Sequence, residues 1–302
     1  MADNDTVDVL QPPAQPTAKI ALEADAAALA RLRADRRRAV ARSFGRSLGN
    51  ALITIVVLLA LWQAVVSFTG ISPYVAKGPL DVFAFLFTDE DAAAHRDQLF
   101  PLLGQTLVDS VIGFAVGMVV AIVLAVLFSL SKAVEAGVMP LVLLLRTIPL
   151  VSIAPVIILI TGRGTTASVA VIGTVVVLFP ALANVLFGLS RASRQSLDVV
   201  HVFGGSRFMA LRKVNIPGAL PSVFAAMRVS VPSAVTGALL AEWLSTGAGI
   251  GGAILKFNAQ AQFAQLWGAI ALITLITLVL YNIVQILENV VLARMGMAVS
   301  IA

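Results

Sequence analysis

Residues 107–130 read LVDSVIGFAVGMVVAIVLAVLFSL, and their only charged residue is Asp109. A helix needs about 20 mainly apolar residues to cross a bilayer, so this stretch is long enough to span one. In the whole chain 59% of the residues are hydrophobic and only 12% are charged, with a mean hydropathy of +0.96. A water-soluble fold cannot bury so much apolar surface. The composition therefore predicts an integral membrane protein.

Further apolar runs on both sides of this stretch predict an all-α, polytopic domain over residues 46–302 with about six transmembrane helices. The predicted spans are about 48–70, 107–130, 136–160, 166–189, 217–243 and 264–290. Basic residues are concentrated in the loop 190–217 and are scarce in the loop after the first span. Since basic loops stay in the cytoplasm, we expect the 190–217 loop and both termini there.

Residues 1–45 differ in composition from the apolar remainder. They begin polar and continue as an alanine-rich, arginine-dense segment, which predicts a partly disordered cytoplasmic extension with a basic helix near anionic lipid. A signal peptide is the alternative, but the apolar run that follows is too long for one. The chain has a net charge of +5, and its basic residues lie beside apolar runs. This placement indicates membrane topology rather than nucleic-acid binding. The chain has no cysteine, which excludes disulfides and thiolate metal sites.

The predicted third span contains Pro140, Pro149 and Pro155, and it also carries Arg146. Proline breaks in a membrane helix are tolerated where protein or water satisfies the freed backbone, so we expect this span inside a bundle, near a translocation path. Arg146 is a candidate for attracting an anionic solute. The alternative is a structural ion pair or a clamp on backbone carbonyls.

Glu242 is predicted near the outer end of the fifth span, as part of a gate or as a packing hydrogen bond. Asp109, near the outer start of the second span, is a candidate buried charge, and simple solvation is the alternative. His95 and His201 are expected in loops or solvent, without a metal. The glycine-rich stretch 246–252 has no Lys-Ser/Thr and predicts a turn or re-entrant segment rather than a phosphate loop. The candidate path residues are therefore Arg146, Pro149, Pro155 and Glu242.

The 190–217 loop combines apolar and basic residues. An apolar patch, formed by Leu197, Val199, Val200, Val202 and Phe203, needs a partner to cover it in the cytosol. Gly204 and Gly205 permit a sharp turn, so we expect two helices with a glycine break between them. An amphipathic loop that rests on the inner membrane surface is the alternative.

This loop resembles the EAA loop of ABC importer permeases, Glu-Ala-Ala-x3-Gly-x9-Ile-x-Leu-Pro. The matching positions here are Asp198, Val199, Val200, Gly204, Val214, Ile216 and Pro217, with Phe203 and Gly205 beside the central glycine. Residues of about 97–295 are similar to the membrane domain of type I importers, particularly the nitrate, sulfonate, taurine and bicarbonate group. The segments that carry this similarity are 105–114, 145–149, 154–155, 161–164, 241–243 and 248–252.

The resemblance implies a permease subunit in the inner (plasma) membrane of a prokaryote. It also implies a second permease, expected to be identical, two cytosolic ABC ATPase subunits that grip the loop, and an extracytoplasmic solute-binding protein. The transported solute would be a small anion such as a sulfonate, taurine or nitrate, moved by alternating access. The chain lacks Gly-x4-Gly-Lys-Ser/Thr, so we expect Mg-ATP on the ATPase partner, and no cofactor, metal or catalytic residue in this chain.

Two other functions remain open from the residues alone. An ion-coupled secondary transporter would need a charged relay within its bundle, and intramembrane charge is sparse here. A membrane scaffold without transport activity would not need the proline breaks of the third span. A membrane enzyme has the least support, because no nucleophile and base are paired in the sequence.

Overall fold

The structure is a computed structural model that describes residues 53–68 and 70–295 of the chain. Contacts group the chain into an N-terminal unit that ends at Leu61 and a second unit, Trp62–Ile301. The predicted extension over residues 1–45 lies outside the described residues. All regular elements among the described residues are helices, which confirms the predicted all-α class.

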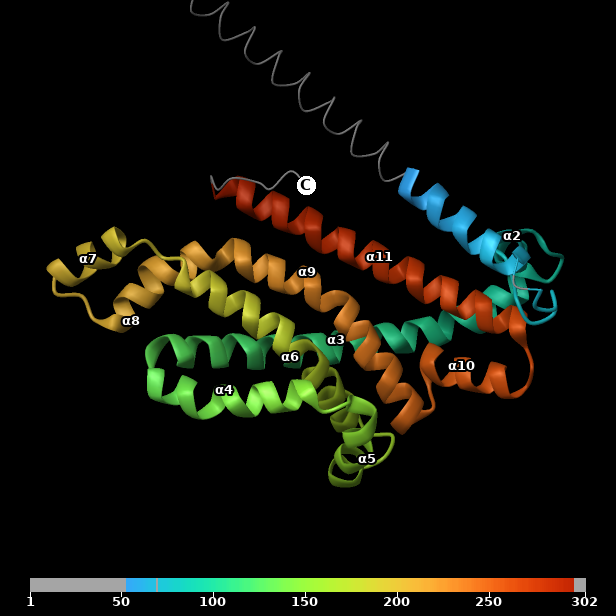
Figure 1. The fold of residues 1–302 in the computed structure, drawn as a ribbon, viewed down its shortest axis with the longest axis horizontal. Coiled ribbons are helices and arrows are strands. Elements are labelled where there is room, and N and C mark those ends of the chain that lie inside the picture. Colours follow the sequence, from blue (N-terminus) through green and yellow to red (C-terminus); the bar gives the residue numbers. More distant parts are fainter. Residues whose placement is uncertain (1–52, 69, 296–302) are drawn as a thin grey trace, which may run out of the picture. The chain divides into compact units, whose positions relative to one another are not determined.

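The second unit holds almost every element (Figure 1). After the apolar helix Ile53–Phe68, the elements in chain order are α2 (Pro79–Phe83) with a π-helical turn (Ala84–Thr88), α3 (Ala92–Leu130), α4 (Lys132–Thr147), α5 (Leu150–Thr161), α6 (Thr166–Ser190), α7 (Arg194–Val202), α8 (Arg207–Ala210) with a π-helical turn (Leu211–Asn215), α9 (Ile216–Ala241) with a π-helical turn (Glu242–Thr246), α10 (Gly249–Ala259) and α11 (Phe263–Arg294).

Four helical segments in the described part of the chain are long and apolar enough to cross a membrane. They are α3, α6, α11 and the continuous helix Arg207–Thr246 that contains α9. The helices α4 and α5 make a fifth candidate if they are counted as one broken span, because they meet at 111°. Of the predicted first span, the described residues include the shorter helix Ile53–Phe68.

The predicted third span is thus not one helix. The chain turns at Ile148, which is extended with φ −78° and ψ 124°, and α5 begins after Pro149. Proline disfavours the helical conformation in the residue before it and cannot donate a backbone hydrogen bond, which accounts for the break at this point. The prediction that Pro140 and Pro155 also interrupt the span was wrong, because both prolines lie inside helices.

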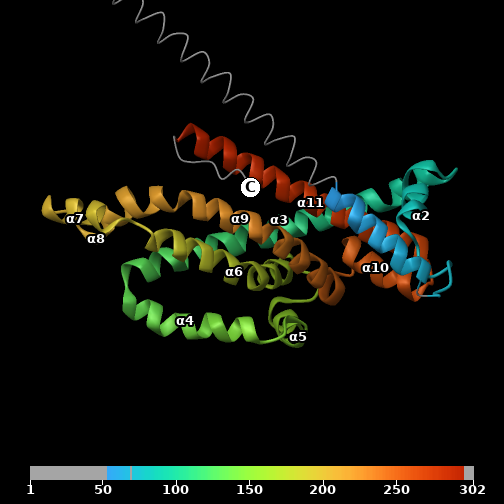
Figure 2. The ribbon, with the colours of Figure 1, turned by 45° about the horizontal axis from the view of Figure 1, so that its top comes forward.

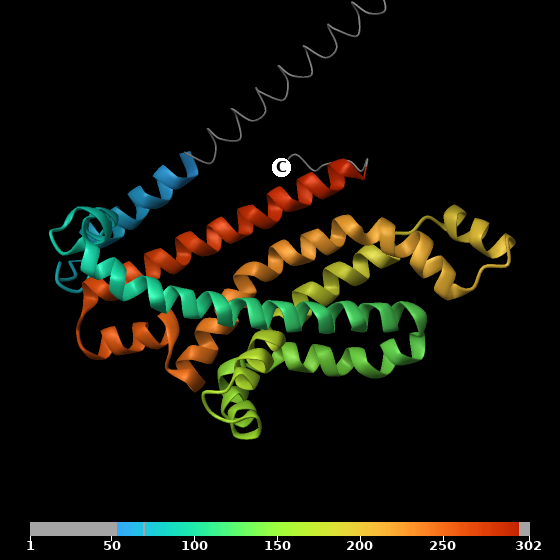
Figure 3. The ribbon, with the colours of Figure 1, turned by 180° about the vertical axis from the view of Figure 1, so that it is seen from behind.

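The core of the bundle forms where α6 packs against both α3 and α9 (Figures 1 and 3). Lipid is as apolar as leucine, so membrane helices associate through close packing, which small residues allow. Alanines at positions 121, 125, 181, 219 and 226 are fully buried in this core. They alternate with larger buried side chains, which include Phe128, Val177 and Leu182.

A second apolar cluster joins the short helices to the start of α11, which runs beside α9 (Figure 2). It contains Phe85, Leu99, Ile250, Phe257 and Ile273, among others. Two longer-range hydrogen bonds support the same region. The Tyr74 hydroxyl donates to the Ala261 carbonyl at 2.8 Å, and Trp267 Nε1 donates to the Val75 carbonyl at 2.9 Å.

The helices α4 and α5 lie at the surface of this single chain. Val142 is the only buried residue of α4, and Ala154 is the only buried residue of α5. The expectation that the third span lies inside a bundle is therefore not met within one chain. Val138, Met139, Leu150, Ile157 and Ile158 pack partly against the core. Most other side chains of α4 and α5 are exposed and can face lipid or another subunit.

Candidate functional site

The 190–217 loop folds as the predicted helix, glycine break and helix. Ser193 precedes α7, and its Oγ accepts a hydrogen bond from the Ser196 N–H at 3.2 Å, which caps the helix. At the other end, the Gly204 N–H donates to the His201 carbonyl at 2.9 Å, and the Gly205 N–H donates to the Val200 carbonyl at 2.8 Å. These two bonds form a Schellman motif, in which the chain leaves the helix through a left-handed residue.

The two glycines are needed for different reasons. Gly204 has φ +74°, a conformation that side chains with a Cβ disfavour, although the space around it is open. At Gly205, a Cβ would overlap the Val200 side chain and would lie 2.7 Å from the Val200 carbonyl oxygen. The first glycine therefore provides the turn, and the second provides the room for α8 to follow.

The apolar residues of α7 divide between two faces. Val199, Val202 and Phe203 point outward and are 56%, 83% and 86% exposed, and we call them the outward face of α7. Leu197 and Val200 are half-buried against the rest of the chain. The sequence placed all five in one patch, so the structure corrects that prediction for Leu197 and Val200.

The loop also carries exposed charged residues. Asp198 is exposed and forms no ion pair with the described residues. Phe208 and Met209 add exposed apolar surface on the far side of the glycine break. The exposed basic residues of the loop are Arg191, Arg194, Arg207, Arg212 and Lys213. The loop thus presents exposed apolar side chains together with five exposed basic residues.

The end of the loop is tied to the bundle. Val214 and Asn215 lie in the π-helical turn before α9, and Pro217 occupies the first turn of α9, where a proline is tolerated. Asn215 Nδ2 donates to the Leu189 carbonyl of α6 at 2.9 Å. The sequence analysis missed this residue, because an asparagine that caps a distant helix end carries no local pattern. Ile216, the first residue of α9, is partly exposed.

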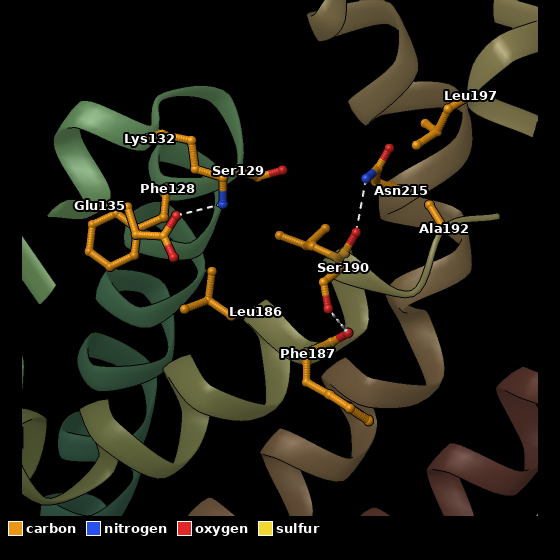
Figure 4. Close-up of a pocket in the computed structure, with 11 residues that line it drawn as sticks. Phe128, Ser129, Lys132, Glu135, Leu186, Phe187, Ser190, Ala192, Leu197 and Asn215 are labelled. Atoms are coloured by element: carbon orange, nitrogen blue, oxygen red, sulfur yellow. Dashed lines mark hydrogen bonds and ion pairs between the residues drawn. The ribbon is translucent and has the colours of Figure 1, made fainter. Parts of the chain in front are cut away.

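A cleft of about 430 Å³ lies beside the base of the loop (Figure 4). Leu186 and Phe128 contribute apolar lining, and Leu197 of α7 faces it from the loop. At the opposite edge, Lys132 Nζ pairs with Glu135 Oε2 at 2.7 Å. The cleft separates α7 from the turn between α3 and α4.

The candidate path residues do not come together in one place. Arg146 is exposed in the last turn of α4, and its Cζ lies 4.0 Å from the centroid of the Phe179 ring. This is a cation–π contact rather than the ion pair that was the alternative. Pro149 stands at the bend and Pro155 lies within α5. A role in the path stays a prediction for these residues.

Glu242 belongs to a separate, buried polar cluster. Its Oε2 accepts hydrogen bonds from the Gly251 N–H at 2.7 Å and from Thr106 Oγ1 at 3.1 Å. Thr106 Oγ1 also accepts from the Ile250 N–H at 2.8 Å. Glu242 is 0% exposed, so the structure contains the packing hydrogen bond that was one of its two predicted roles. A gating role stays a prediction.

Asp109 is 4% exposed, which is the buried alternative of the two predicted for it, and its Oδ1 accepts a hydrogen bond from Gln105 Nε2 at 3.1 Å. The prediction for His95 needs correction. His95 is a half-buried residue of α3, where it stacks on the Phe85 ring and its Nδ1 lies 2.9 Å from the Phe85 carbonyl oxygen. His201 is exposed in the last turn of α7.

The sequence analysis also missed one ion pair inside the membrane domain. Arg228 of α9 and Glu288 of α11 approach to 3.3 Å, and the Arg228 Cζ lies 5.9 Å from the centroid of the Tyr281 ring. The available signal was the basic Arg228 in the predicted span 217–243 and the acidic Glu288 in the predicted span 264–290. Charges at membrane depth usually pair with one another.

Comparisons with known proteins match most of the chain to membrane subunits of transport systems. Residues 113–297 match the family model described as "Binding-protein-dependent transport system inner membrane component". The chain is 30% identical to a probable ABC transporter permease protein of Haemophilus influenzae, over 76% of this chain and 91% of that protein. It is 28% identical to a riboflavin transport system permease protein of Chloroflexus aurantiacus, over 78% and 87%. A taurine transport system permease protein of Escherichia coli is 24% identical, over 58% and 64%.

Proposed function

Because the chain belongs to the family of binding-protein-dependent transport system inner membrane components, we propose that it is the permease subunit of a solute importer driven by a separate ATPase, which binds α7. Family membership confirms the predicted resemblance to ABC importer permeases, and it agrees with an integral membrane protein. It argues against the ion-coupled transporter and the scaffold as alternatives.

The observation that carries this proposal is the outward face of α7. Three large apolar side chains of one short helix stand exposed outside the bundle, in a loop with five exposed basic residues. An exposed apolar helix face of this kind is stabilised by insertion into a groove of a partner protein. Val199 and Phe203 are spaced by one helical turn, so a single groove can cover both.

The contacts around α7 offer a route from the ATPase to the bundle. Leu197 and Val200 form the half-buried side of α7, and the glycine break connects α7 to α8. The Asn215 bond to Leu189 then joins the start of α9 to the end of α6. A pull on α7 would therefore move the ends of two core helices together, and the adjoining cleft leaves space for that movement.

The proposed assembly contains a second, identical permease, two ATPase subunits with Mg-ATP, and an extracytoplasmic solute-binding protein. The exposed surfaces of α4 and α5 support a second permease subunit, because a partner there would surround the broken span with protein. We place the 190–217 loop and both termini in the cytoplasm, on the basis of the basic residues in that loop.

The proposed solute is a small anion. The named solutes of the relatives differ, with riboflavin for one and taurine for another. The feature in this chain that favours an anion is Arg146, which is exposed at the bend between α4 and α5 and has no acidic partner among the described residues. A positive group without a counterion is available for an anionic solute.

Co-purification from membranes tests the binding of the ATPase. The parent protein and the double variant Val199→Asp/Phe203→Asp are extracted in mild detergent, and the bound proteins are identified by mass spectrometry. We expect a phosphate-loop ATPase with the parent and at least tenfold less with the variant. The control is Leu80→Asp/Phe83→Asp, which places the same two charges at exposed apolar positions of α2. Equal ATPase recovery from all three proteins would refute α7 as the docking helix.

A further inference from the structure

Two acidic side chains lie together in the interior of the second unit. Asp109 of α3 is 4% exposed and Glu242, which follows α9, is 0% exposed. Asp109 lies about one helical turn after Thr106, whose hydroxyl donates to the Glu242 carboxyl group, so the two acids are neighbours. One oxygen of each carboxyl has the donors described above. The other two oxygens, Asp109 Oδ2 and Glu242 Oε1, are buried without a hydrogen-bond partner.

No cation among the described residues compensates this pair. The described ion pairs join Lys132 to Glu135 and Arg228 to Glu288, away from the two acids. The nearest charged groups on the packed elements are exposed or distant: Arg163 in the loop between α5 and α6, Lys256 on α10, and His95, Arg96 and Asp97 more than three turns before Asp109 on α3. The remaining neighbours, Gln105, Thr106, Ser168 and Ser245, are neutral.

Electrostatics then limits how many charges the pair can hold. Two neighbouring carboxylates within a site of low dielectric cannot both be ionised, because their repulsion and their desolvation act in the same direction. A single proton removes one charge. An O–H on one unpartnered oxygen that donates to the other would also give both of them a hydrogen bond.

We propose that Asp109 and Glu242 bind one proton between Oδ2 and Oε1, and that this shared proton fastens the glycine turn, residues 247–252, to α3. The proton comes from hydronium in the surrounding water: one hydronium O–H bond breaks, the carboxyl O–H bond forms, and a neutral water molecule is released. With the proton in place, Glu242 remains bound to the turn and to Thr106. Without it, repulsion from Asp109 pushes Glu242 and the turn away from α3.

The turn is shaped around the Glu242 side chain. Gly249 has φ +61°, and a Cβ at this position would overlap the Glu242 carboxyl group. A Cβ on Gly251 would lie 2.9 Å from Glu242 Oε2 and 2.6 Å from the Leu239 carbonyl oxygen. The N–H groups of Ile250 and Gly251, in the first turn of α10, point to Thr106 and Glu242. The position of α10 against α3 therefore depends on this carboxyl group.

Infrared spectroscopy of the purified full chain in lipid nanodiscs tests for the proton. We expect the parent at neutral pH to give the carbonyl band of a protonated carboxylic acid, shifted in D₂O. Asp109→Asn and Glu242→Gln should each abolish the band. Asp97→Asn, a matched change at an exposed acid of α3, should leave it unchanged. A folded parent without the band at neutral pH would overturn the proposal, whatever the variants do.

Thermal unfolding supplies a second, independent readout. The Glu242→Gln amide can donate to Asp109 Oδ2 without a proton, so this variant should unfold at or above the parent midpoint at alkaline pH, whereas Glu242→Leu should unfold below it. The parent should lose stability relative to Glu242→Gln as the pH rises, since its unfolded state releases a proton that the folded state keeps. The same unfolding midpoints are measured with sodium ions in place of choline ions in the buffer. If sodium raises the parent midpoint and Glu242→Gln abolishes that effect, a metal cation occupies the pair and the proposal is wrong.

Discussion

Gly173 of α6 lies so close to Gly113 of α3 that a Cβ added to Gly173 would stand 2.5 Å from the Gly113 Cα. Gly237 of α9 approaches the same point, because a Cβ added there would lie 3.0 Å from the Gly173 Cα. Three core helices thus cross with backbone against backbone (Figure 3). In a membrane such close approach contributes much of the packing energy between helices.

Gly173→Ala should therefore destabilise the bundle. The added methyl group meets backbone atoms, which cannot move aside as a side chain can, so we expect a loss of about 1–3 kcal/mol. The control is Gly104→Ala, in α3, where a Cβ meets nothing within 4 Å and the helix gains up to about 1 kcal/mol. Thermal unfolding of the two purified variants checks this. Similar midpoints for the two would mean that the crossing is not tightly packed.

Gly204 should tolerate asparagine but not valine. Valine resists a positive φ, and the left-handed conformation costs about 1–2 kcal/mol for a residue with a Cβ. Asparagine adopts it more readily. We expect Gly204→Val to insert normally, with solute uptake reduced several-fold relative to ATP hydrolysis, and Gly204→Asn to stay within about twofold of the parent. Uptake and hydrolysis measured together in vesicles check the ratio, and an unchanged ratio for valine would argue against a mechanical role for the turn.

Asn215→Leu should separate ATPase binding from transport. It removes the hydrogen bond to the Leu189 carbonyl and leaves that acceptor unpaired, at a cost of about 1–3 kcal/mol. Since the outward face of α7 is untouched, the ATPase should co-purify as with the parent, while solute uptake falls. Ser190→Ala, which removes an exposed bond to the Phe187 carbonyl, is the control. Loss of ATPase binding in Asn215→Leu would mean that Asn215 acts only by holding α7 in shape.

Glu288→Gln should loosen α11 from α9. Breaking a buried ion pair typically costs about 3–5 kcal/mol, and we expect less here because the Arg228 side chain is 21% exposed. The swapped variant Arg228→Glu/Glu288→Arg should recover part of that loss. A double-mutant cycle on unfolding midpoints measures the coupling between the two residues. A coupling energy near zero would mean that the two charges are separately solvated.

The extent of the helices was largely predictable from composition. In lipid, backbone groups must bond within their own segment, so an apolar run long enough to cross becomes a helix whatever its neighbours are. The glycine break could be placed for a similar reason, because Gly204 and Gly205 meet local demands of conformation and space. The prolines were harder to interpret. Pro140, Pro149 and Pro155 look equivalent in the sequence. Only Pro149 follows an extended residue and interrupts the helix.

The contacts between distant residues were not predictable. Burial and solvation of Asp109 could not be distinguished, because its neighbour Glu242 lies on another helix. The Thr106 bond to Glu242 joins residues 136 positions apart. Arg228 and Glu288 were missed for the same reason. Burial and pairing of a charge depend on which helix faces it, and one sequence without a fold does not contain that information.

By itself, the sequence determined that this chain lies in a membrane as helices and carries a basic loop with a glycine break. These properties depend on hydrophobicity and backbone conformation, which act over a few residues. Only the tertiary structure decided that Val199 faces outward while Val200 packs inward, and that two acids share one buried site. Neighbouring positions on a helix point in different directions, so burial is set by packing against elements far away in the chain.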